Sequence, residues 1–235
     1  MMRFARLTAL IGKEASINLS HKTVLVAGIG GVGSFALEGL VRSGIGTLII
    51  IDNDVVDITN INRQLIALDS TIGMKKIDVA QKRLHDINPL VKVITKAIFI
   101  DATTIDSVFD RSIDFVVDAV DNMMAKLLLL QKASELKIPI ISAMGFGNKM
   151  HPELIKITTL NKTSVCPLAK TMRQKVRALE LPDDTPVVFS TELPILPIDP
   201  LVKIGSSSTV PSTAGLMMAS YVINSFICQT RGSQL

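Results

Sequence analysis

The sequence predicts an α/β fold built on a doubly wound, mostly parallel sheet with an irregular C-terminal lobe. Two observations support this prediction. Short apolar runs alternate with amphipathic segments over residues 23–144, a pattern typical of β-α-β units with right-handed crossovers. After residue 150 prolines interrupt the alternation, so we expect loops and short strands packed on the sheet. These prolines include Pro182, Pro186, Pro194, Pro197, Pro200 and Pro211.

The individual elements follow from hydrophobic periodicity. Helix-like spacing runs from Arg3 to about Leu19, ahead of the first strand. Apolar runs predict strands at 23–29, 47–52, 91–100, 113–121 and 139–144. Helices are expected at 33–44, 75–88, 104–110 and 122–136, with a closing helix from Pro211 onward.

Length and composition are those of a globular protein. At 235 residues the chain can form one α/β domain with its own core. The longest apolar stretch, residues 214–228, is shorter than the roughly 20 residues that span a bilayer. We therefore expect a buried core helix there and no membrane span. The only cysteines, Cys166 and Cys228, suit a cytoplasmic protein and exclude a four-cysteine zinc site within the chain.

Basic residues are concentrated in one segment, although the net charge of the whole chain is only +4. Residues 149–177 contain seven Lys or Arg against one acid, Glu153. A surface that binds a polyanion would have this composition, and so would a solvated helix surface. Charge alone does not decide between them. The basic residues are Lys149, Lys156, Lys162, Lys170, Arg173, Lys175 and Arg177.

A glycine-rich turn follows the first strand and opens the next helix. Its sequence, GIGGVG, contains Gly28, Gly30, Gly31 and Gly33. Backbone N–H groups of such a turn can surround a phosphate at the helix N-terminus. Asp52 follows 19 residues after the last of these glycines, where a carboxylate can accept from ribose hydroxyls. The sequence thus predicts a Rossmann-like nucleotide site, which alone does not distinguish NAD from another nucleotide.

Polar residues after the later strands favour ATP with Mg²⁺ over NAD. Asn60 and Arg63 lie three residues apart on one turn, and an arginine offers a fixed fork to a phosphate oxygen. Lys76 begins the next helix, where its ammonium can reach a β- or γ-phosphate. Asp121 ends a buried strand and can hold Mg²⁺. Lys126 follows about one turn into the next helix. Two cations, a carboxylate and a phosphate-binding turn suit ATP with Mg²⁺ better than a dinucleotide.

Histidine usage also argues against a dehydrogenase, which needs a residue to relay a proton. The only histidines are His21, His85 and His151. His21 precedes the first predicted strand, and His85 lies on a predicted surface helix. Only His151 is placed where a catalytic role is conceivable, and we do not expect one.

The string GIGGVG…IDND…TNINRQ…GMKK…DAVDN resembles the adenylating superfamily of ubiquitin-activating enzymes and their bacterial, ThiF- and MoeB-like relatives. The resemblance implies one adenylating domain over residues 1–235, with a nucleotide-binding core at 1–150 and a substrate-side lobe with the closing helix at 151–235. It implies that ATP binds the glycine turn together with Asp52, Asp54, Asn60, Arg63, Lys76, Asp121 and Asn122. Catalysis would rest on Arg63, Lys76, Asp121 and Arg6.

Two of these roles carry further implications. Asp121 would be the ligand of Mg²⁺. In the superfamily an arginine near the N-terminus reaches the partner subunit's ATP site, and Arg6 matches it, so the resemblance implies a homodimer.

The second half of the chain indicates the branch. The stretches "SAMGFGNKMHPELIKITTLNKTSVCPLAKTMRQKVR", "VVFSTELP" and "VPSTAGLMMAS" resemble the family of tRNA threonylcarbamoyladenosine dehydratases. These enzymes use ATP to cyclise the threonylcarbamoyl group of the adenosine beside the anticodon. The resemblance implies tRNA as partner, contacted by Lys170 and Arg173. The segment 193–209 is shorter than the family pattern, which leaves the tRNA contacts there open.

Two alternatives stay open at this point. Activation of the C-terminus of a ubiquitin-like sulfur carrier would use the same nucleotide site, and a cysteine desulfurase or sulfur-acceptor system would then be a partner. A non-enzymatic nucleotide-sensing or tRNA-binding module is the other, but sensing does not need a second phosphate-binding cation. Cys166 could form a thioester, although Pro167 follows it directly and adenylation needs no thiol. We expect it to have a structural or substrate-lining role.

Overall fold

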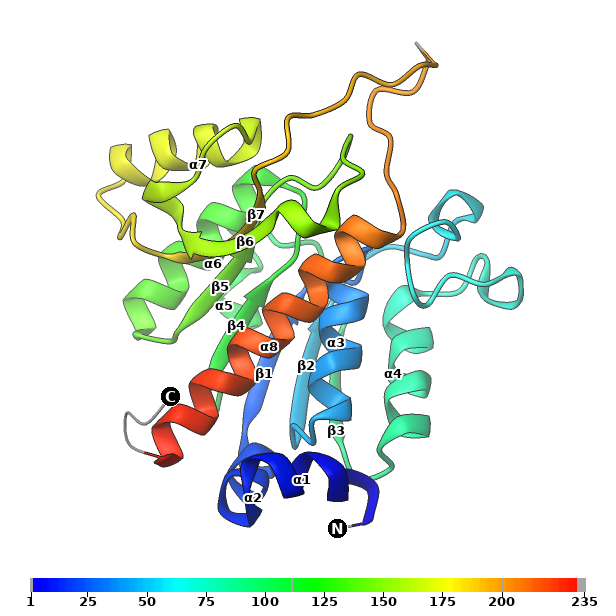
Figure 1. Ribbon diagram of the computed structural model, residues 1–235, viewed down its shortest axis with the longest axis vertical. Helices are drawn as coiled ribbons and strands as arrows, with labels where there is room; N and C mark the ends of the chain where they lie inside the picture. The colour runs from blue at the N-terminus through cyan, green and yellow to red at the C-terminus, as the bar shows by residue number, and fades with distance from the viewer. Residues whose placement is uncertain (1, 111, 200, 232–235) are drawn as a thin grey trace.

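A seven-stranded sheet forms the centre of the protein, with helices on both faces (Figure 1). The computed structural model describes residues 2–110, 112–199 and 201–231. The strands are β1 (Thr23–Ala27), β2 (Thr47–Ile51), β3 (Lys92–Lys96), β4 (Phe115–Asp118), β5 (Ile140–Ala143), β6 (Ile155–Thr159) and β7 (Pro186–Ser190). The helices are α1 (Ala5–Ile11), α2 (Lys13–His21), α3 (Gly33–Arg42), α4 (Lys76–Ile87), α5 (Ile105–Val108), α6 (Met123–Leu136), α7 (Pro167–Ala178) and α8 (Thr209–Arg231).

The strand order is β3-β2-β1-β4-β5-β7-β6. All neighbouring pairs are parallel except β6 and β7, which are antiparallel. The chain runs outward from β1 to β3, then returns to place β4 on the other side of β1. This reversal creates a switch point between β1 and β4, where ligands bind in doubly wound sheets. The predicted doubly wound, mostly parallel sheet is confirmed.

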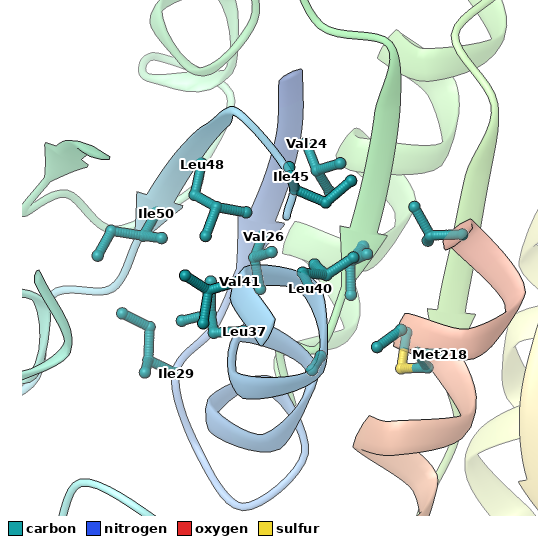
Figure 2. Packing of buried hydrophobic residues seen from close by; sticks show 14 of the residues in the cluster. Val24, Val26, Ile29, Leu37, Leu40, Val41, Ile45, Leu48, Ile50 and Met218 are labelled. Carbon is teal, nitrogen blue, oxygen red and sulfur yellow. The ribbon is translucent and has the colours of Figure 1, made fainter. Parts of the chain in front are cut away.

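The side chains of the central strands alternate between two apolar layers. One layer lies between the sheet and helices α3 and α8, and Figure 2 shows the side chains of α3 directed at those of β1 and β2. The other layer lies between the sheet and helices α5 and α6. The first layer includes Val24, Val26, Leu37, Leu40, Val41, Leu48, Ile50 and Met218, and the second includes Leu25, Ala27, Ile49, Ile51, Val108 and Leu129.

Several predicted elements are shorter than expected, among them the strand predicted at 113–121, which ends at Asp118 and leaves Asp121 in the following loop. The shortening of the N-terminal helix and of the third strand has a clear physical reason. The N-terminal helix is divided at Gly12, whose φ of 89° belongs to a region that glycine adopts without strain and that ends a helix. The third strand stops at Lys96 instead of continuing to residue 100. Its only neighbour in the sheet, β2, ends at Ile51, the partner of Lys96, so residues 97–100 have no strand to pair with.

The C-terminal part is more regular than predicted. β7 and β6 extend the main sheet instead of packing on it, and α7 is a helix that the sequence analysis missed. Pro167 occupies its first helical position, where proline is favourable. The longest irregular stretch of the described C-terminal part comprises residues 191–199 and 201–208. The division into a nucleotide-binding core at 1–150 and a substrate-side lobe at 151–235 remains a prediction.

The closing helix α8 lies across α3 (Figure 1) and contributes Met218 and Val222 to the core. This agrees with the prediction of a buried helix over residues 214–228. None of the helices in the described residues combines the length and the apolarity needed to cross a bilayer.

Two glycines of the turn allow β1, β4 and α3 to meet. A Cβ on Gly28 would lie 2.7 Å from the carbonyl oxygen of Ala119, and φ there is +85°. A Cβ on Gly33 would lie 1.8 Å from the carbonyl oxygen of Gly28. These contacts hold the turn against the end of β4. By contrast, the nearest atom to a Cβ on Gly30 would be 4.0 Å away.

The Gly33→Ala substitution is expected to destabilise the fold. The added methyl group collides with backbone and requires α3 to shift, which costs about 3 kcal/mol or more and lowers Tm by about 6–12 °C. Thermal unfolding followed by circular dichroism measures the change. Gly30→Ala is the matched control and should unfold within about 2 °C of the wild type. Equal Tm values for the two variants would contradict this account of the turn.

Candidate active site

A cleft with a volume of about 1240 Å³ opens where the carboxyl ends of β1, β2, β4 and β5 meet. The three polar segments predicted from the sequence converge on it: the glycine turn, the loop after β2 and the loop after β4. Ten of the predicted nucleotide-binding residues line it, namely Gly28, Gly30, Gly31, Asp52, Asp54, Asn60, Arg63, Lys76, Asp121 and Asn122. Gly33 does not line the cleft and serves the packing of the turn described above.

The glycine turn presents one open position to the cleft. Gly30 lines the cleft, and a Cβ there would have no atom closer than Gln64 Nε2 at 4.0 Å. Gly31 is more closely covered, with a Cβ at 3.2 Å from Pro211 of α8. The backbone at Gly30 is therefore accessible to a ligand at the N-terminus of α3, which is a favourable position for phosphate.

Asp52 joins the loop after β2 to the glycine turn. Its carboxylate accepts hydrogen bonds from the backbone N–H of Ile29 at 2.6 Å and of Asp54 at 2.8 Å. Burial raises the pKa of this carboxyl, while the two N–H groups and the ammonium of Lys76 oppose that shift. Each oxygen keeps a lone pair after these bonds, so the carboxylate can still accept from a ribose hydroxyl.

Lys76 lines the cleft and forms an ion pair with Asp54. Its Nζ lies 2.8 Å from Asp54 Oδ2, and the side chain is only 6% exposed. The ammonium has three N–H donors, and this ion pair uses one of them. The pair therefore orients the charge without exhausting it, so Lys76 can also donate to a phosphate.

Asn60 and Arg63 share a turn after β2, as predicted. The 3₁₀ turn Ile58–Asn60 begins with a capping box, in which Asn60 Oδ1 accepts from the N–H of Asp57 at 3.2 Å. Arg63 Nη1 donates to the carbonyl of Thr59 at 2.8 Å and to Asn62 Oδ1 at 3.1 Å. A guanidinium has five N–H donors, so these bonds fix its direction and leave others for an anion.

Asn122 and Asp121 differ in what they do locally. Asn122 caps α6, because its Oδ1 accepts from the N–H groups of Met124 at 2.9 Å and Ala125 at 3.1 Å. Asp121 has an exposed side chain that lines the cleft.

Among the described residues no three His, Cys, Asp or Glu side chains group into a metal site. A single carboxylate beside a phosphate site still fits Mg²⁺, which takes one or two carboxylates plus substrate phosphates and water.

Lys126 does not supply a cation to the cleft. Its side chain is 1% exposed, and Nζ lies 3.0 Å from Asp118 Oδ2, which is itself fully buried. α6 turns this residue toward the interior of the sheet, so the ammonium is neutralised there by Asp118. Arg63 and Lys76 are the two predicted cations that line the cleft.

Arg6 lies far from the cleft of its own chain. It is exposed on α1, which packs at the amino ends of the strands, at the opposite end of the molecule (Figure 1). Within one chain it cannot touch the ATP site, so any role in catalysis requires a second copy.

The basic segment at 149–177 divides into buried and exposed residues. Lys149 is buried, and its Nζ donates to the carbonyls of Ser190 at 3.1 Å and Glu192 at 2.8 Å. Burial lowers its pKa. Lys149 therefore does not belong to a polyanion surface, contrary to the composition argument. Lys156, Lys162, Lys170 and Lys175 are exposed.

Arg173 is tied to the protein rather than free. Its Nη1 donates to the carbonyl of Thr163 at 3.0 Å and also contacts the hydroxyl of the same residue. These bonds hold α7 against the preceding loop. Lys170, one turn earlier on α7, is exposed, so the two predicted tRNA contacts differ in how available they are.

Cys166 is buried directly before α7 and does not line the cleft. A Cβ on Gly145, which does line the cleft, would lie 3.5 Å from Cys166 Sγ. The thiol thus supports the cleft wall from behind, as expected for a structural residue. His151 is exposed and pairs with Glu153 at 2.8 Å.

The far wall of the cleft consists of residues that were not predicted from the sequence. Residues 145–147 after β5 and residues 204–206 of the irregular segment line the cleft. Asn148, with φ at +60°, links the two: its N–H donates to the carbonyl of Gly205 at 2.8 Å, and its Oδ1 accepts from the Gly205 N–H at 2.6 Å. Only the unusual length of the 193–209 segment indicated that this region matters.

Gln64 is a further residue that the prediction omitted. It lines the cleft, and its Oε1 is buried without a hydrogen-bond partner among the described residues. A buried carbonyl oxygen without a hydrogen bond lowers the stability of the fold, so a donor usually reaches it. Together with the open face of Gly30, this orphan acceptor fits a site completed by a ligand.

Comparisons with known proteins agree with this geometry. The chain is 40% identical to the tRNA threonylcarbamoyladenosine dehydratase of Bacillus subtilis, an alignment that covers 94% of this chain and 93% of the relative. The crystal structure of the Escherichia coli tRNA N6-threonylcarbamoyladenosine dehydratase in complex with ATP superposes with a TM-score of 0.92 at 30% identity, covering 99% of this chain and 96% of that one.

Sulfur-transfer relatives match less of the chain. The adenylyltransferase and sulfurtransferase UBA4 of Vanderwaltozyma polyspora is 37% identical over 59% of this chain and 31% of its own length. The ThiF family model, in contrast, matches residues 4–233. The chain belongs to the ThiF family, in the branch of the tRNA threonylcarbamoyladenosine dehydratases.

Proposed function

We propose that this protein uses ATP to cyclise N6-threonylcarbamoyladenosine beside the tRNA anticodon. The threonyl carboxylate attacks the α-phosphate of ATP, and pyrophosphate leaves. A carbamoyl oxygen or nitrogen of the same nucleoside then attacks the acyl carbon. AMP departs with the original carboxylate oxygen and a proton is released, so the nucleoside loses one molecule of water.

One observation carries this proposal above the others. Asp52, Arg63 and Lys76 of the β2–α4 connection and Asp121 after β4 line a single cleft, in a chain that is 40% identical to a named dehydratase over 94% of its length. Acyl adenylation needs charge neutralisation and in-line positioning more than a nucleophile. The cleft offers these two functions.

Each side chain has a role that follows from its geometry. Asp52, already anchored to the glycine turn, accepts from the ribose. Arg63 and Lys76 neutralise charge that develops on the phosphates. Asn60 lies on the same turn as Arg63 and supports its position. Asp121 would hold Mg²⁺, which neutralises phosphate charge and makes pyrophosphate a better leaving group.

The substrate side is formed by the residues after β5 and by α7. tRNA would contact the exposed lysines of α7, because one face of that helix is buried and the other carries the charge. A cytoplasmic location follows from tRNA as substrate. A cysteine desulfurase or sulfur-acceptor system is a partner suggested only by the resemblance to sulfur-carrier enzymes.

Activation of a ubiquitin-like sulfur carrier is the second candidate, since the nucleotide site would be the same. The shorter match to the UBA4 relatives favours the dehydratase. The two differ in the substrate carboxylate, so adenylate formation with a carrier ending in Gly-Gly, and none with tRNA, would favour the alternative.

Asp121→Ala is expected to abolish pyrophosphate release while leaving Tm unchanged, because the side chain is exposed and only the proposed metal contact is lost. Arg63→Ala should lower the rate by roughly 10²–10³, as for a single electrostatic donor. The assay combines purified protein, ATP, Mg²⁺ and modified tRNA, with mass spectrometry of the nucleosides. Full activity of Asp121→Ala, or no cyclic product with wild type, would refute the proposal.

Lys170→Glu combined with Lys175→Glu is expected to weaken tRNA binding and leave ATP affinity unchanged, because both residues lie outside the cleft lining. The slope of log Kd against log salt should fall by about one for each lysine that contacts a phosphate. Lys82→Glu on α4, on the other side of the molecule (Figure 1), is the control. Equal weakening by the control would mean that only net charge matters.

The protein is expected to be a homodimer in which Arg6 completes the partner's site. Light scattering at micromolar concentration should give twice the chain mass. Arg6→Ala should reduce adenylation without changing the mass, and mixing it with Asp121→Ala should restore part of the activity, because one of the two sites then keeps both residues. A fully active monomer would rule out this role.

A further inference from the structure

The largest fully buried side chain of the described residues is a charged one, Lys126. Its ammonium lies 3.0 Å from Asp118 Oδ2 and 3.4 Å from Ser142 Oγ. The Ser142 hydroxyl donates to the same carboxylate oxygen. All three side chains are at most 1% exposed. They connect the end of β4, the second turn of α6 and the middle of β5.

A buried ion pair is a poor way to stabilise a fold. Desolvation of both charges offsets most of their attraction, and apolar side chains of similar size often stabilise as well or better. The layer around this pair is otherwise apolar, with Ala125 and Leu129 on the same helix. The pair is better explained by what it positions than by its contribution to stability.

The second oxygen of Asp118 points to the cleft loop. Asp118 Oδ1 accepts from the backbone N–H of Val120 at 3.2 Å, which closes a turn immediately before Asp121. On the other side of Asp121, the carbonyl of Asn122 accepts from the Lys126 N–H at 3.1 Å. Asp121 thus lies between a turn that the Asp118 carboxylate holds and the first backbone hydrogen bond of α6, which does not involve the Lys126 side chain.

We infer that Lys126 is a positioning residue for the proposed adenylation: its buried ammonium fixes the Asp118 carboxylate so that Oδ1 holds the Val120 turn and directs Asp121 at the metal and the phosphates. Lys126 touches neither nucleotide nor substrate. This inference rests on the proposed role of Asp121 as the Mg²⁺ ligand.

The test compares ATP binding with and without Mg²⁺, measured by calorimetry on the full chain, together with Mg²⁺ activation of pyrophosphate release. Lys126→Met keeps the length and removes the charge. It should raise the Mg²⁺ concentration for half-maximal activation by about 10- to 100-fold, the range for residues that orient metal ligands. ATP affinity in EDTA should change less than about twofold, since none of the phosphate-binding cations is altered.

Three further variants separate positioning from folding. Lys126→Arg retains the charge and should recover part of the Mg²⁺ response. Lys132→Met is the control on the same helix. Lys132 Nζ lies 2.6 Å from Asp106 Oδ1, and neither residue lines the cleft, so this variant should behave as wild type. If Lys126→Met does not fold, Lys126→Met with Asp118→Leu removes both charges and also the acceptor for Val120. That pair should fold and show the same defect.

The outcomes are distinct. A wild-type Mg²⁺ response in folded Lys126→Met, or in the double variant, overturns the positioning role. Loss of ATP affinity in EDTA as large as the loss in Mg²⁺ also overturns it, because the defect would then not act through Asp121. If wild type binds ATP equally with and without Mg²⁺, the metal role of Asp121 in the proposed function fails, and this inference fails with it.

Discussion

The contact between the glycine turn and the end of β4 is the constraint on which the site depends. Gly28 lies so close to the carbonyl of Ala119 that a Cβ would be 2.7 Å from it, and Gly33 lies even closer to Gly28. These approaches bring the ends of β1 and β4 and the start of α3 together at the switch point of the sheet. Any side chain at either glycine would separate the loops that line the cleft.

Charged residues of the same type have different uses because their surroundings differ. Lys76 is paired with Asp54 at the cleft edge, where the ammonium can still reach an anion. Lys126 and Lys149 are buried, and both bond to protein oxygens. The exposed lysines of α7 remain available for a polyanion. Local partners, and not residue type, decide whether each lysine lines the cleft, lies in the interior or lies on the surface.

The two halves of the chain are joined at the cleft by small polar contacts. Asn148 pairs with Gly205 through both backbone and side chain, and Asn62 Nδ2 donates to the carbonyl of Ser206 at 2.8 Å. The phosphate-side turn thus contacts the irregular segment that forms the far wall. The cleft is therefore lined by segments that lie far apart in the sequence.

The sequence by itself determined the parallel sheet, the nucleotide turn and the ten predicted residues that line the cleft, because periodicity and short motifs encode local structure and strand ends. It missed α7, which lies before the prolines that interrupt the rest of the C-terminal part. It did not reveal that Lys126 and Lys149 are buried, because the direction of each side chain depends on how α6 and the loop after β5 pack. Only the tertiary structure decided which cations face the cleft, because burial and pairing arise from contacts between segments distant in sequence.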